Sequence, residues 1–179
     1  MTVSMKTTTT TALLRYGVLM GALALLAAVG CGGIGSDAAI PAVLQNVDPS
    51  LIVRRGQLYF VQDPAAGREL AEKKGLPCLL FFTADWCTFC RQMEATAFED
   101  SSVAALADNF VCVLVDADRE PKICQDFQVP GYPTIQFIAA NGTQLHRLVG
   151  RQSAPDLAHG MQAALKRFAW LHEAATTMR

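Results

Sequence analysis

Apolar residues along the chain fall into short runs separated by polar and turn-forming segments. Two uninterrupted runs, residues 77–83 (PCLLFFT) and 110–115 (FVCVLV), have the length and composition of strands that are buried on both faces. Shorter segments predict the remaining elements. Together the pattern predicts strands over 58–61, 77–83, 110–115, 134–138 and 144–149, and helices over 65–74, 87–107 (interrupted near 98–101), 120–127 and from Ser153 onward.

Capping and turn residues mark the ends of several of these elements. Asp63 and Pro64 supply an N-cap and a proline at the first helical position. Asn141-Gly142 is a strong hairpin signal, and Ser153 with Asp156 three residues on resembles a capping box. The element order β-α-β-α-β-α-β-β-α predicts an α/β fold, in which an antiparallel hairpin forms one edge of the sheet.

The first thirty residues are predicted to be a signal peptide of the lipoprotein type. Lys6 and Arg15 precede an uncharged apolar run over residues 16–30. A basic start, a short apolar segment and a small-residue exit are typical of a secretory signal. The exit leads into Cys31 and resembles a bacterial lipobox, whose cysteine is acylated and becomes the new N-terminus. Ala28 departs from that pattern, because Leu or Val is commoner there.

Two alternatives to lipidation of Cys31 stay open, a plain signal peptide and an uncleaved membrane anchor. The uncharged stretch over residues 16–36 is about long enough to cross a bilayer, which takes about 20 residues. All three alternatives place the rest of the chain outside the cytoplasm.

The segment that follows Cys31 is predicted to be a flexible tether, since it contains Gly, Pro and Asp without a steady period. Apolar Ile40, Val43 and Leu44 favour packing of part of it on the domain. The expected organisation is a signal peptide over 1–30, a tether over 31–55, a folded domain over 56–172 and a tail over 173–179.

Composition argues against several classes of protein. The chain has 179 residues, of which 51% are hydrophobic, and its net charge is −1, which does not suit a disordered chain. Fifteen basic residues against 16 acidic ones leave no positive excess for binding a nucleic-acid backbone. The length fits one domain with appendages.

The candidate chemistry lies in Cys87 and Cys90, which follow a predicted buried strand directly and open a helix. Unsatisfied N–H groups at the start of a helix stabilise a thiolate, and the thiolate is the nucleophile in disulfide exchange. Cys90 lies one turn on and faces the same side, so it can attack the mixed disulfide that Cys87 forms with a substrate. The spacing therefore predicts a redox-active Cys87–Cys90 disulfide.

At these residues the chain resembles the thioredoxin superfamily, and most of all the C-terminal thioredoxin-like domain of bacterial transmembrane thiol:disulfide interchange reductases. The resemblance rests on FFTADWCTFCRQMEATAFEDSSVAALADNF and VPGYPTIQFI and covers about residues 56–168. It implies a thioredoxin-like fold, with a central mixed sheet flanked by helices and an antiparallel hairpin at one edge.

Carried over residue by residue, the resemblance implies that Cys87 is the nucleophile and Cys90 the resolving thiol. Pro133 matches the cis-proline of the family, which faces the disulfide. A cis bond there turns the backbone of Tyr132 toward the sulfurs, where it can pair with an extended substrate. Trp86 is expected to pack beside the cysteine pair and, with Tyr132, to contact the substrate.

The chain departs from the family at Phe81. Many members carry a buried acid at this position, six residues before the nucleophile, and use it to move protons. Members of the reductase subgroup have acids at the positions of Asp85 and Glu94. We expect one of these two to take the proton-relay role, and the alternative is that both are solvated surface charges.

Other interpretations of the cysteines stay open. The Cys87–Cys90 pair could be half of a zinc site, but structural zinc needs four ligands and the remaining Cys and His residues lack ligand spacing. It could also be a structural disulfide in a binding module. Cys112 could pair with Cys78 or with Cys124, although buried free thiols are the default for all three.

The predicted function is that of a membrane-tethered, extracytoplasmic thiol:disulfide oxidoreductase that works in the reducing direction. Neither a metal nor an organic cofactor is expected, since the redox centre is the cysteine pair. The expected partners are disulfide-containing exported proteins, a transmembrane electron donor and, through a lipid anchor, the membrane at the periplasmic face of the cell envelope. We expect a monomer that binds no nucleic acid. The alternatives are a non-catalytic thioredoxin-like peptide-binding lipoprotein and a dedicated electron shuttle to one envelope partner.

Overall fold

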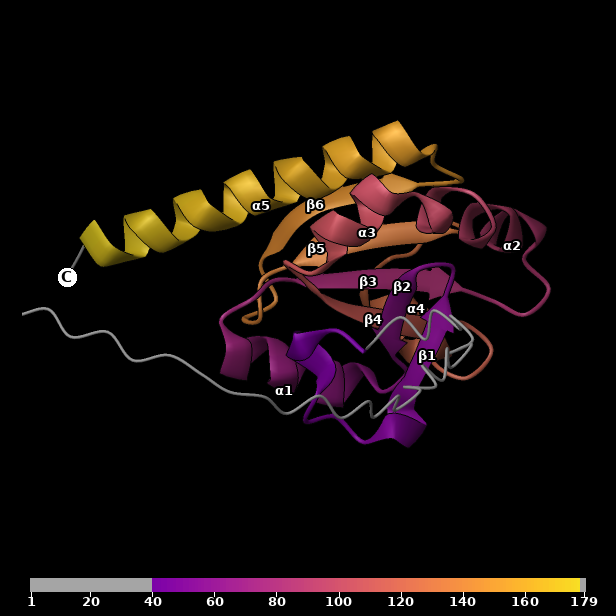
Figure 1. Ribbon diagram of the computed structural model, residues 1–179, viewed down its shortest axis with the longest axis horizontal. Helices are drawn as coiled ribbons and strands as arrows, with labels where there is room; N and C mark the ends of the chain where they lie inside the picture. The colour runs from indigo at the N-terminus through magenta and orange to yellow at the C-terminus, as the bar shows by residue number, and fades with distance from the viewer. Residues whose placement is uncertain (1–39, 178–179) are drawn as a thin grey trace, which may run out of the picture. The chain divides into compact units, whose positions relative to one another are not determined.

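The computed structural model describes residues 40–177 (Figure 1). The predicted signal peptide over 1–30 and the predicted lipidation site Cys31 therefore lie outside the described residues. Within residues 40–177, no helix is both long enough and apolar enough to cross a membrane.

A mixed six-stranded sheet with helices on both faces forms the centre of the fold (Figure 1). The strands lie in the order β1-β2-β4-β3-β5-β6; β4 pairs in parallel with β2 and β3, and the other neighbouring strands are antiparallel. The strands are β1 (Ile52–Arg55), β2 (Leu58–Val61), β3 (Cys78–Thr83), β4 (Val111–Asp116), β5 (Thr134–Ile138) and β6 (Gln144–Val149). The helices are η1 (Ala42–Leu44), η2 (Pro49–Leu51), α1 (Pro64–Lys74), α2 (Thr88–Glu94), η3 (Ala97–Glu99), α3 (Ser101–Ala107), α4 (Pro121–Asp126) and α5 (Ala154–Thr177). The predicted α/β class and the antiparallel edge hairpin are confirmed.

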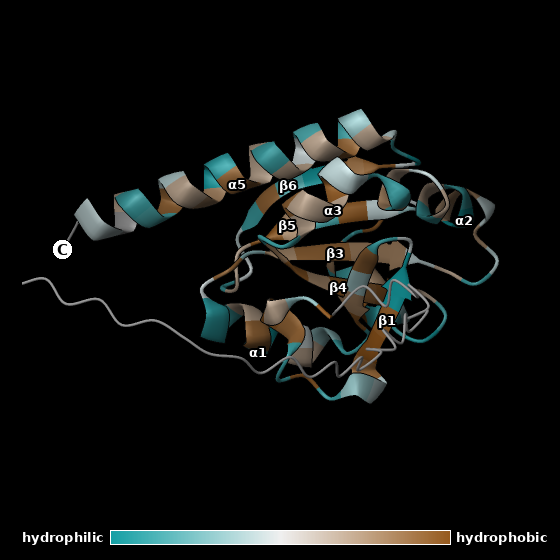
Figure 2. Cartoon of the chain, in the orientation of Figure 1, coloured by the Kyte–Doolittle hydropathy of each residue, from teal (hydrophilic) through white to brown (hydrophobic). Residues whose placement is uncertain are grey.

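Alternation along the central strands divides the hydrophobic core into two layers, because successive side chains of a strand point to opposite faces. Leu79 and Phe81 of β3 face the layer that α2, α3 and α5 cover, whereas Leu80 and Phe82 face the layer under α1 and α4. All of β3 is buried, and Figure 2 shows it as hydrophobic along its whole length, whereas α5 carries hydrophobic and hydrophilic bands. The uninterrupted apolar run in the sequence thus marks the strand that is covered on both faces.

An aromatic cluster fills the core layer that α2 helps to cover. The ring centroids of Phe60 and Phe98 lie 5.6 Å apart, and those of Phe81 and Phe98 lie 5.0 Å apart in an edge-to-face arrangement. Phe98 belongs to η3, directly after α2, so these contacts attach the end of that helical segment to the sheet. Phe81, six residues before Cys87, is fully buried as part of this cluster.

Part of the predicted tether over 31–55 belongs to the fold instead. Strand β1 (Ile52–Arg55) pairs antiparallel with β2, and Leu44 of η1 is only 2% exposed. Gly56 turns the chain between the two strands at φ +59°, and the backbone N–H of Gln57 donates to the carbonyl of Phe98 at 2.8 Å. The sheet therefore begins before the expected domain boundary at residue 56.

Two helix boundaries also differ from the prediction. The predicted helix over 87–107 divides into α2, η3 and α3, and its first break comes after Glu94, earlier than the expected interruption near 98–101. Helix α5 continues through Thr177, past the expected end of the domain at residue 172. At its start the Asp156 N–H donates to Ser153 Oγ at 3.3 Å, as the capping-box pattern predicts.

Candidate active site

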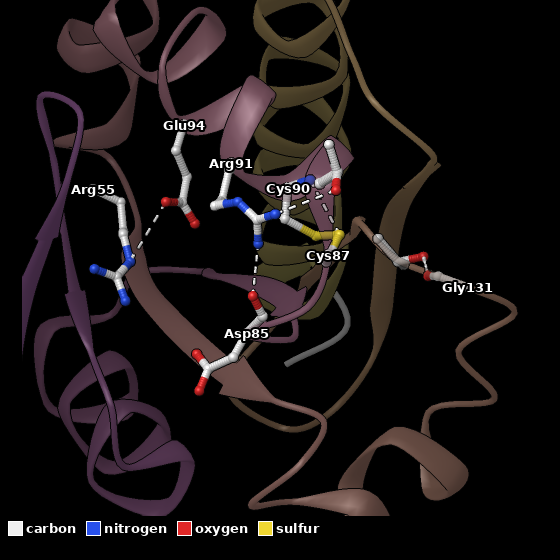
Figure 3. Close-up of a disulfide and its surroundings, with 9 residues drawn as sticks. Arg55, Asp85, Cys87, Cys90, Arg91, Glu94 and Gly131 are labelled. Carbon is white, nitrogen blue, oxygen red and sulfur yellow. Dashed lines mark hydrogen bonds and ion pairs between the residues drawn. A yellow bond between two sulfur atoms is a disulfide. The ribbon is translucent and has the colours of Figure 1, made fainter.

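A disulfide bond joins Cys87 and Cys90 at the start of α2 (Figure 3). The S–S distance is 1.98 Å and the two Cα atoms lie 5.3 Å apart. Cys87 caps the helix, because its Sγ accepts a hydrogen bond from the backbone N–H of Cys90 at 3.1 Å. Such a donor stabilises negative charge on the sulfur when the disulfide is opened.

The loop between β3 and α2 fixes the position of the leading cysteine. The Cys87 N–H donates to the carbonyl of Ala84 at 3.0 Å. The Arg91 guanidinium reaches back from α2 and donates to the carbonyl of Asp85 at 2.6 Å and to Thr88 Oγ1 at 3.2 Å (Figure 3). The strand, the loop and the first turn of α2 therefore form one hydrogen-bonded unit around the disulfide.

The Tyr132–Pro133 peptide bond is cis, as the resemblance implies for this position. The Pro133 carbonyl accepts a hydrogen bond from the Gly150 N–H at 2.8 Å, and Thr134 Oγ1 donates to the Gly131 carbonyl at 2.7 Å. These bonds hold the segment before β5 from both sides.

Trp86 brings this proline segment and the cysteine loop together. Its indole ring meets the ring of Tyr132 edge to face, with centroids 5.8 Å apart. Its indole N–H donates to the Asp118 carboxylate at 3.2 Å, yet the side chain is 64% exposed. Phe89, inside the CxxC motif, is 59% exposed. The surface beside the disulfide therefore presents two large aromatic side chains to solvent.

Tyr132 connects this surface to the interior. Burial, together with a hydrogen bond to the thiol of Cys124, raises the pKa of the Tyr132 hydroxyl to about 12. The Tyr132 ring packs against Trp86 and against buried residues of both core layers.

The two candidate proton-relay residues have different surroundings. Glu94, at the end of α2, is half-buried, and burial raises the pKa of its carboxyl group although Arg55 and Arg91 both lower it. Its Oε2 lies 3.7 Å from Nε of Arg55, and Figure 3 shows the carboxylate turned toward that residue. Asp85 is exposed and lines a small polar hollow of about 90 Å³ together with Arg55. The relay role stays a prediction for both acids.

The default expectation of buried free thiols holds, and the alternative of a second disulfide from Cys112 does not. Cys78, Cys112 and Cys124 are free and buried. Cys112 belongs to the core layer on the α2 side of the sheet, whereas Cys78 and Cys124 belong to the opposite layer, so the sheet separates Cys112 from both. Burial raises the pKa of the Cys78 thiol to about 12 and also raises that of Cys112. Over residues 40–177, no group of three His, Cys, Asp or Glu side chains is arranged to hold a metal ion.

The structure adds two residues to the site that the sequence did not single out. Asp118 holds the indole of Trp86, and Arg55 pairs with Glu94 from β1. Neither lies in a motif, and only contacts between distant segments bring Asp118 to Trp86 and Arg55 to Glu94.

Comparisons with known proteins agree with this geometry. The family model of the thioredoxin-like domain matches residues 66–165. The thiol:disulfide interchange protein DsbD of Vibrio vulnificus is 39% identical over 97 residues, which are 50% of this chain and 16% of that protein. The protein of the same name from Ralstonia nicotianae is 35% identical over 100 residues, 53% of this chain and 16% of that protein. The chain thus spans about a sixth of the length of these curated relatives.

Two solved structures share the fold. A thioredoxin from Thermus thermophilus superposes with a TM-score of 0.52 at 22% identity, covering 56% of this chain and 82% of that one. DsbH oxidoreductase superposes with a TM-score of 0.51 at 24% identity, covering 68% of this chain and 92% of that one. Because the family model covers more than half of the sequence, the chain belongs to the thioredoxin-like domain family.

Proposed function

We propose that this chain is a thiol:disulfide oxidoreductase in which Cys87 attacks substrate disulfides and Cys90 resolves the mixed disulfide. The observation that carries the proposal is the Cys87–Cys90 bond at the start of α2, next to the cis-proline segment. The N–H of Cys90 points at the sulfur of Cys87, where it would stabilise a thiolate. This favours Cys87 as the sulfur that meets a substrate.

In the reducing direction, the reaction starts from the dithiol. The Cys87 thiolate attacks one sulfur of the substrate disulfide, the substrate S–S bond breaks, and the other substrate sulfur leaves as a thiolate that takes up a proton. Cys90 then loses its proton and attacks Cys87 Sγ, which forms the Cys87–Cys90 bond and releases the second substrate thiolate. The substrate gains two electrons, and a partner dithiol must return them to the chain.

We assign to Glu94 the role of accepting the proton that the Cys90 thiol loses. The two residues are four apart on α2, so their side chains leave neighbouring positions on one face of the helix. A half-buried carboxyl group whose pKa is raised can take up and release a proton closer to neutral pH than an exposed one. Asp85 is the second candidate, and its exposure favours Glu94 over it.

The substrate surface that we assign consists of Trp86 and Tyr132, with the exposed Phe89 beside them. Aromatic rings next to the sulfur pair can cover the apolar side chains that flank a disulfide in an extended segment. Pro133, whose bond is cis, is assigned the role of orienting the Tyr132 backbone toward that segment.

The direction of electron flow and the cellular setting are further parts of the proposal. Similarity to thiol:disulfide interchange proteins supports the exchange chemistry. From the resemblance of the cysteine motif to the reductase subgroup we assign the reducing direction, with disulfide-containing exported proteins as substrates and a transmembrane protein as electron donor. The signal over residues 1–30, acylation of Cys31 and the segment leading to Ile40 would tether a monomeric domain at the periplasmic face of the envelope.

Single-cysteine variants test the assignment of the two sulfurs. Cys87→Ser should abolish the acceleration that the unmodified protein gives to the reduction of insulin by dithiothreitol. Cys90→Ser should accumulate covalent substrate adducts in cells, to be identified by mass spectrometry. Cys78→Ser is the matched control, since it removes a buried free thiol. An active Cys87→Ser protein would refute the nucleophile. Inactivity toward insulin combined with a single trapped adduct would favour a dedicated electron shuttle. Inactivity toward insulin with no trapped adduct would favour a peptide-binding protein.

Lipid labelling tests the tether. Cys31→Ser should abolish the incorporation of labelled fatty acid and release the protein from the membrane fraction. Retention and labelling equal to those of the unmodified chain would show that another segment anchors it.

A further inference from the structure

The hairpin formed by β1 and β2 is attached to the segment that ends the active-site helix. The N–H of Gln57 donates to the Phe98 carbonyl at 2.8 Å, and its side-chain amide donates to the Glu99 carbonyl at 2.6 Å. At Gly56 the chain passes so close that a Cβ atom there would lie 2.7 Å from the Phe98 backbone. The hairpin turn and η3 therefore hold a fixed relation to each other, and α2 lies directly before η3.

This attachment places the last residue of β1 beside the active-site helix. Arg55 Nε lies 3.7 Å from Glu94 Oε2, and the side chains are 40% and 21% exposed. The neighbouring Arg54 is exposed and differently engaged, since its Nε donates to the Gly56 carbonyl and its guanidinium lies 5.7 Å from the centre of the Tyr59 ring. Successive side chains of a strand point to opposite faces, so only one of the two arginines can face α2.

We propose that Arg55 is a positioning residue of the redox site, which acts on the cysteine pair through Glu94 by keeping that carboxyl group ionised and turned toward β1. The inference rests on the proposed role of Glu94 as the acceptor of the Cys90 proton. It makes the β1–β2 hairpin, at the end of the segment predicted to be a tether, a working part of the redox unit.

The charges around Glu94 support this assignment. Arg55 from β1 and Arg91 from α2 both favour the carboxylate, whereas burial opposes it and prevails. Arg91 is already engaged by the Asp85 carbonyl and Thr88 Oγ1, which leaves Arg55 as the cation that pairs with Glu94. On its other side Arg55 lines the polar hollow, whose charged residues are Asp85, Asp116, Arg119 and Glu120. Removing the Arg55 charge leaves Arg91 to offset the burial of the Glu94 carboxyl group, so the proton of that group should bind more tightly.

The test follows the Glu94 carboxyl group by NMR in the full chain with ¹³C-labelled glutamate, using Glu94→Gln to assign the signal. Arg55→Gln should raise the titration midpoint by about half a pH unit or more, as expected for loss of a partly exposed ion pair. The rate at which Cys90 resolves mixed disulfides prepared on Cys87 should fall at low pH, and this acidic limb of the pH–rate profile should move to higher pH by the same amount. Arg55→Lys should restore both.

Arg54→Gln is the matched control, because it removes the same charge one position earlier without touching Glu94. The unmodified protein gives a second measurement, since added salt screens the ion pair and should move the Glu94 midpoint upward, with less effect in Arg55→Gln. An unchanged midpoint in Arg55→Gln, or an equal shift in Arg54→Gln, overturns the inference. If Glu94→Gln loses the acidic limb of the resolving step but Arg55→Gln has the same limb as the unmodified protein, the role of Arg55 is refuted and that of Glu94 is not. If Glu94→Gln itself keeps the limb, the proposed relay falls as well.

Discussion

The Asp118 carboxylate holds the indole nitrogen of Trp86 at 3.2 Å, and this single bond fixes an exposed aromatic ring next to the disulfide. The opposite constraint comes from Tyr132, whose ring meets the indole at 81°. A side chain that is 64% exposed would otherwise sample several rotamers. The contacts with Asp118 and Tyr132 therefore restrict the Trp86 side chain to one orientation.

Loss of the Asp118 bond should weaken substrate handling without altering the sulfur chemistry. Asp118→Ala is expected to lower the rate of insulin reduction by about fivefold, since a hydrogen bond contributes about 1 kcal/mol. The pH at which Cys87 becomes reactive should stay unchanged. Steady-state assays and alkylation of the reduced protein measure the two quantities. Asp126→Ala, in an exposed pair with Lys122, is the control, and equal rates for both variants would contradict the prediction.

The turn at Gly56 should tolerate no side chain. Gly56→Ala is expected to lower the free energy of unfolding by about 2 kcal/mol or more, because φ is +59° and the added Cβ would meet the Phe98 backbone. Gly75→Ala isolates the conformational part, since Gly75 has φ +65° and nothing within 4 Å of the added atom. Denaturant unfolding compares the two. A loss in Gly56→Ala no larger than that in Gly75→Ala would show that the hairpin turn can move away from Phe98.

Glu94 should reduce the stability of the fold at neutral pH. Burial raises the pKa of its carboxyl group above the usual 4.5, so folding favours the protonated form. The stabilising contribution of that form is complete below pH 4.5 and is lost as the pH rises through the pKa of the folded chain. Glu94→Gln should therefore be more stable than the parent at pH 7, and the two should converge in acid.

Denaturant midpoints measured across this pH range test the sign. Glu69→Gln serves as the comparison, because the hydrogen bond from Lys73 lowers the pKa of Glu69. Replacing Glu69 should slightly reduce the free energy of unfolding at pH 7, which is the opposite of the change expected for Glu94→Gln. A Glu94→Gln protein that is less stable than the parent at neutral pH would show that the Arg55 pair outweighs burial.

The buried thiols should remain inert while the active pair cycles. In the reduced native protein, maleimide at pH 7 is expected to label Cys87 at least about 100-fold faster than Cys78, because burial raises the pKa of the Cys78 thiol to about 12. Cys112 should behave in the same way. Peptide mass spectrometry after timed quenching gives the rates, and labelling in denaturant gives the reference. Comparable native rates would mean that the sheet opens readily.

The parts of the fold that local patterns encode were predictable. The apolar run before Cys87, the CxxC spacing and the Asn141-Gly142 turn act over a few residues, and each lies where the sequence places it. Strand β1 was missed, because four residues that include two arginines carry no clear period and owe their conformation to pairing with β2. Its contribution to the site, Arg55, was missed with it.

Long-range contacts account for the other differences. Asp118 lies 32 residues from Trp86, and no local signal connects a loop after β4 with the residue before Cys87. The early end of α2 likewise depends on the packing of Phe98 against the aromatic cluster, which a helical pattern over 87–107 does not reveal. Sequence reasoning therefore found the disulfide-bonded cysteines but not the groups that hold the residues around them.

The division of the cysteines between the two sides of the sheet bears on how the domain survives repeated turnover. Cys112 shares the core layer of the Cys87–Cys90 disulfide, whereas Cys78 and Cys124 lie on the opposite side of the sheet. In the folded domain, exchange of the disulfide with Cys78 or Cys124 would first require the central strands to come apart. The fully buried strand β3 thus also separates the disulfide from two of the three buried thiols.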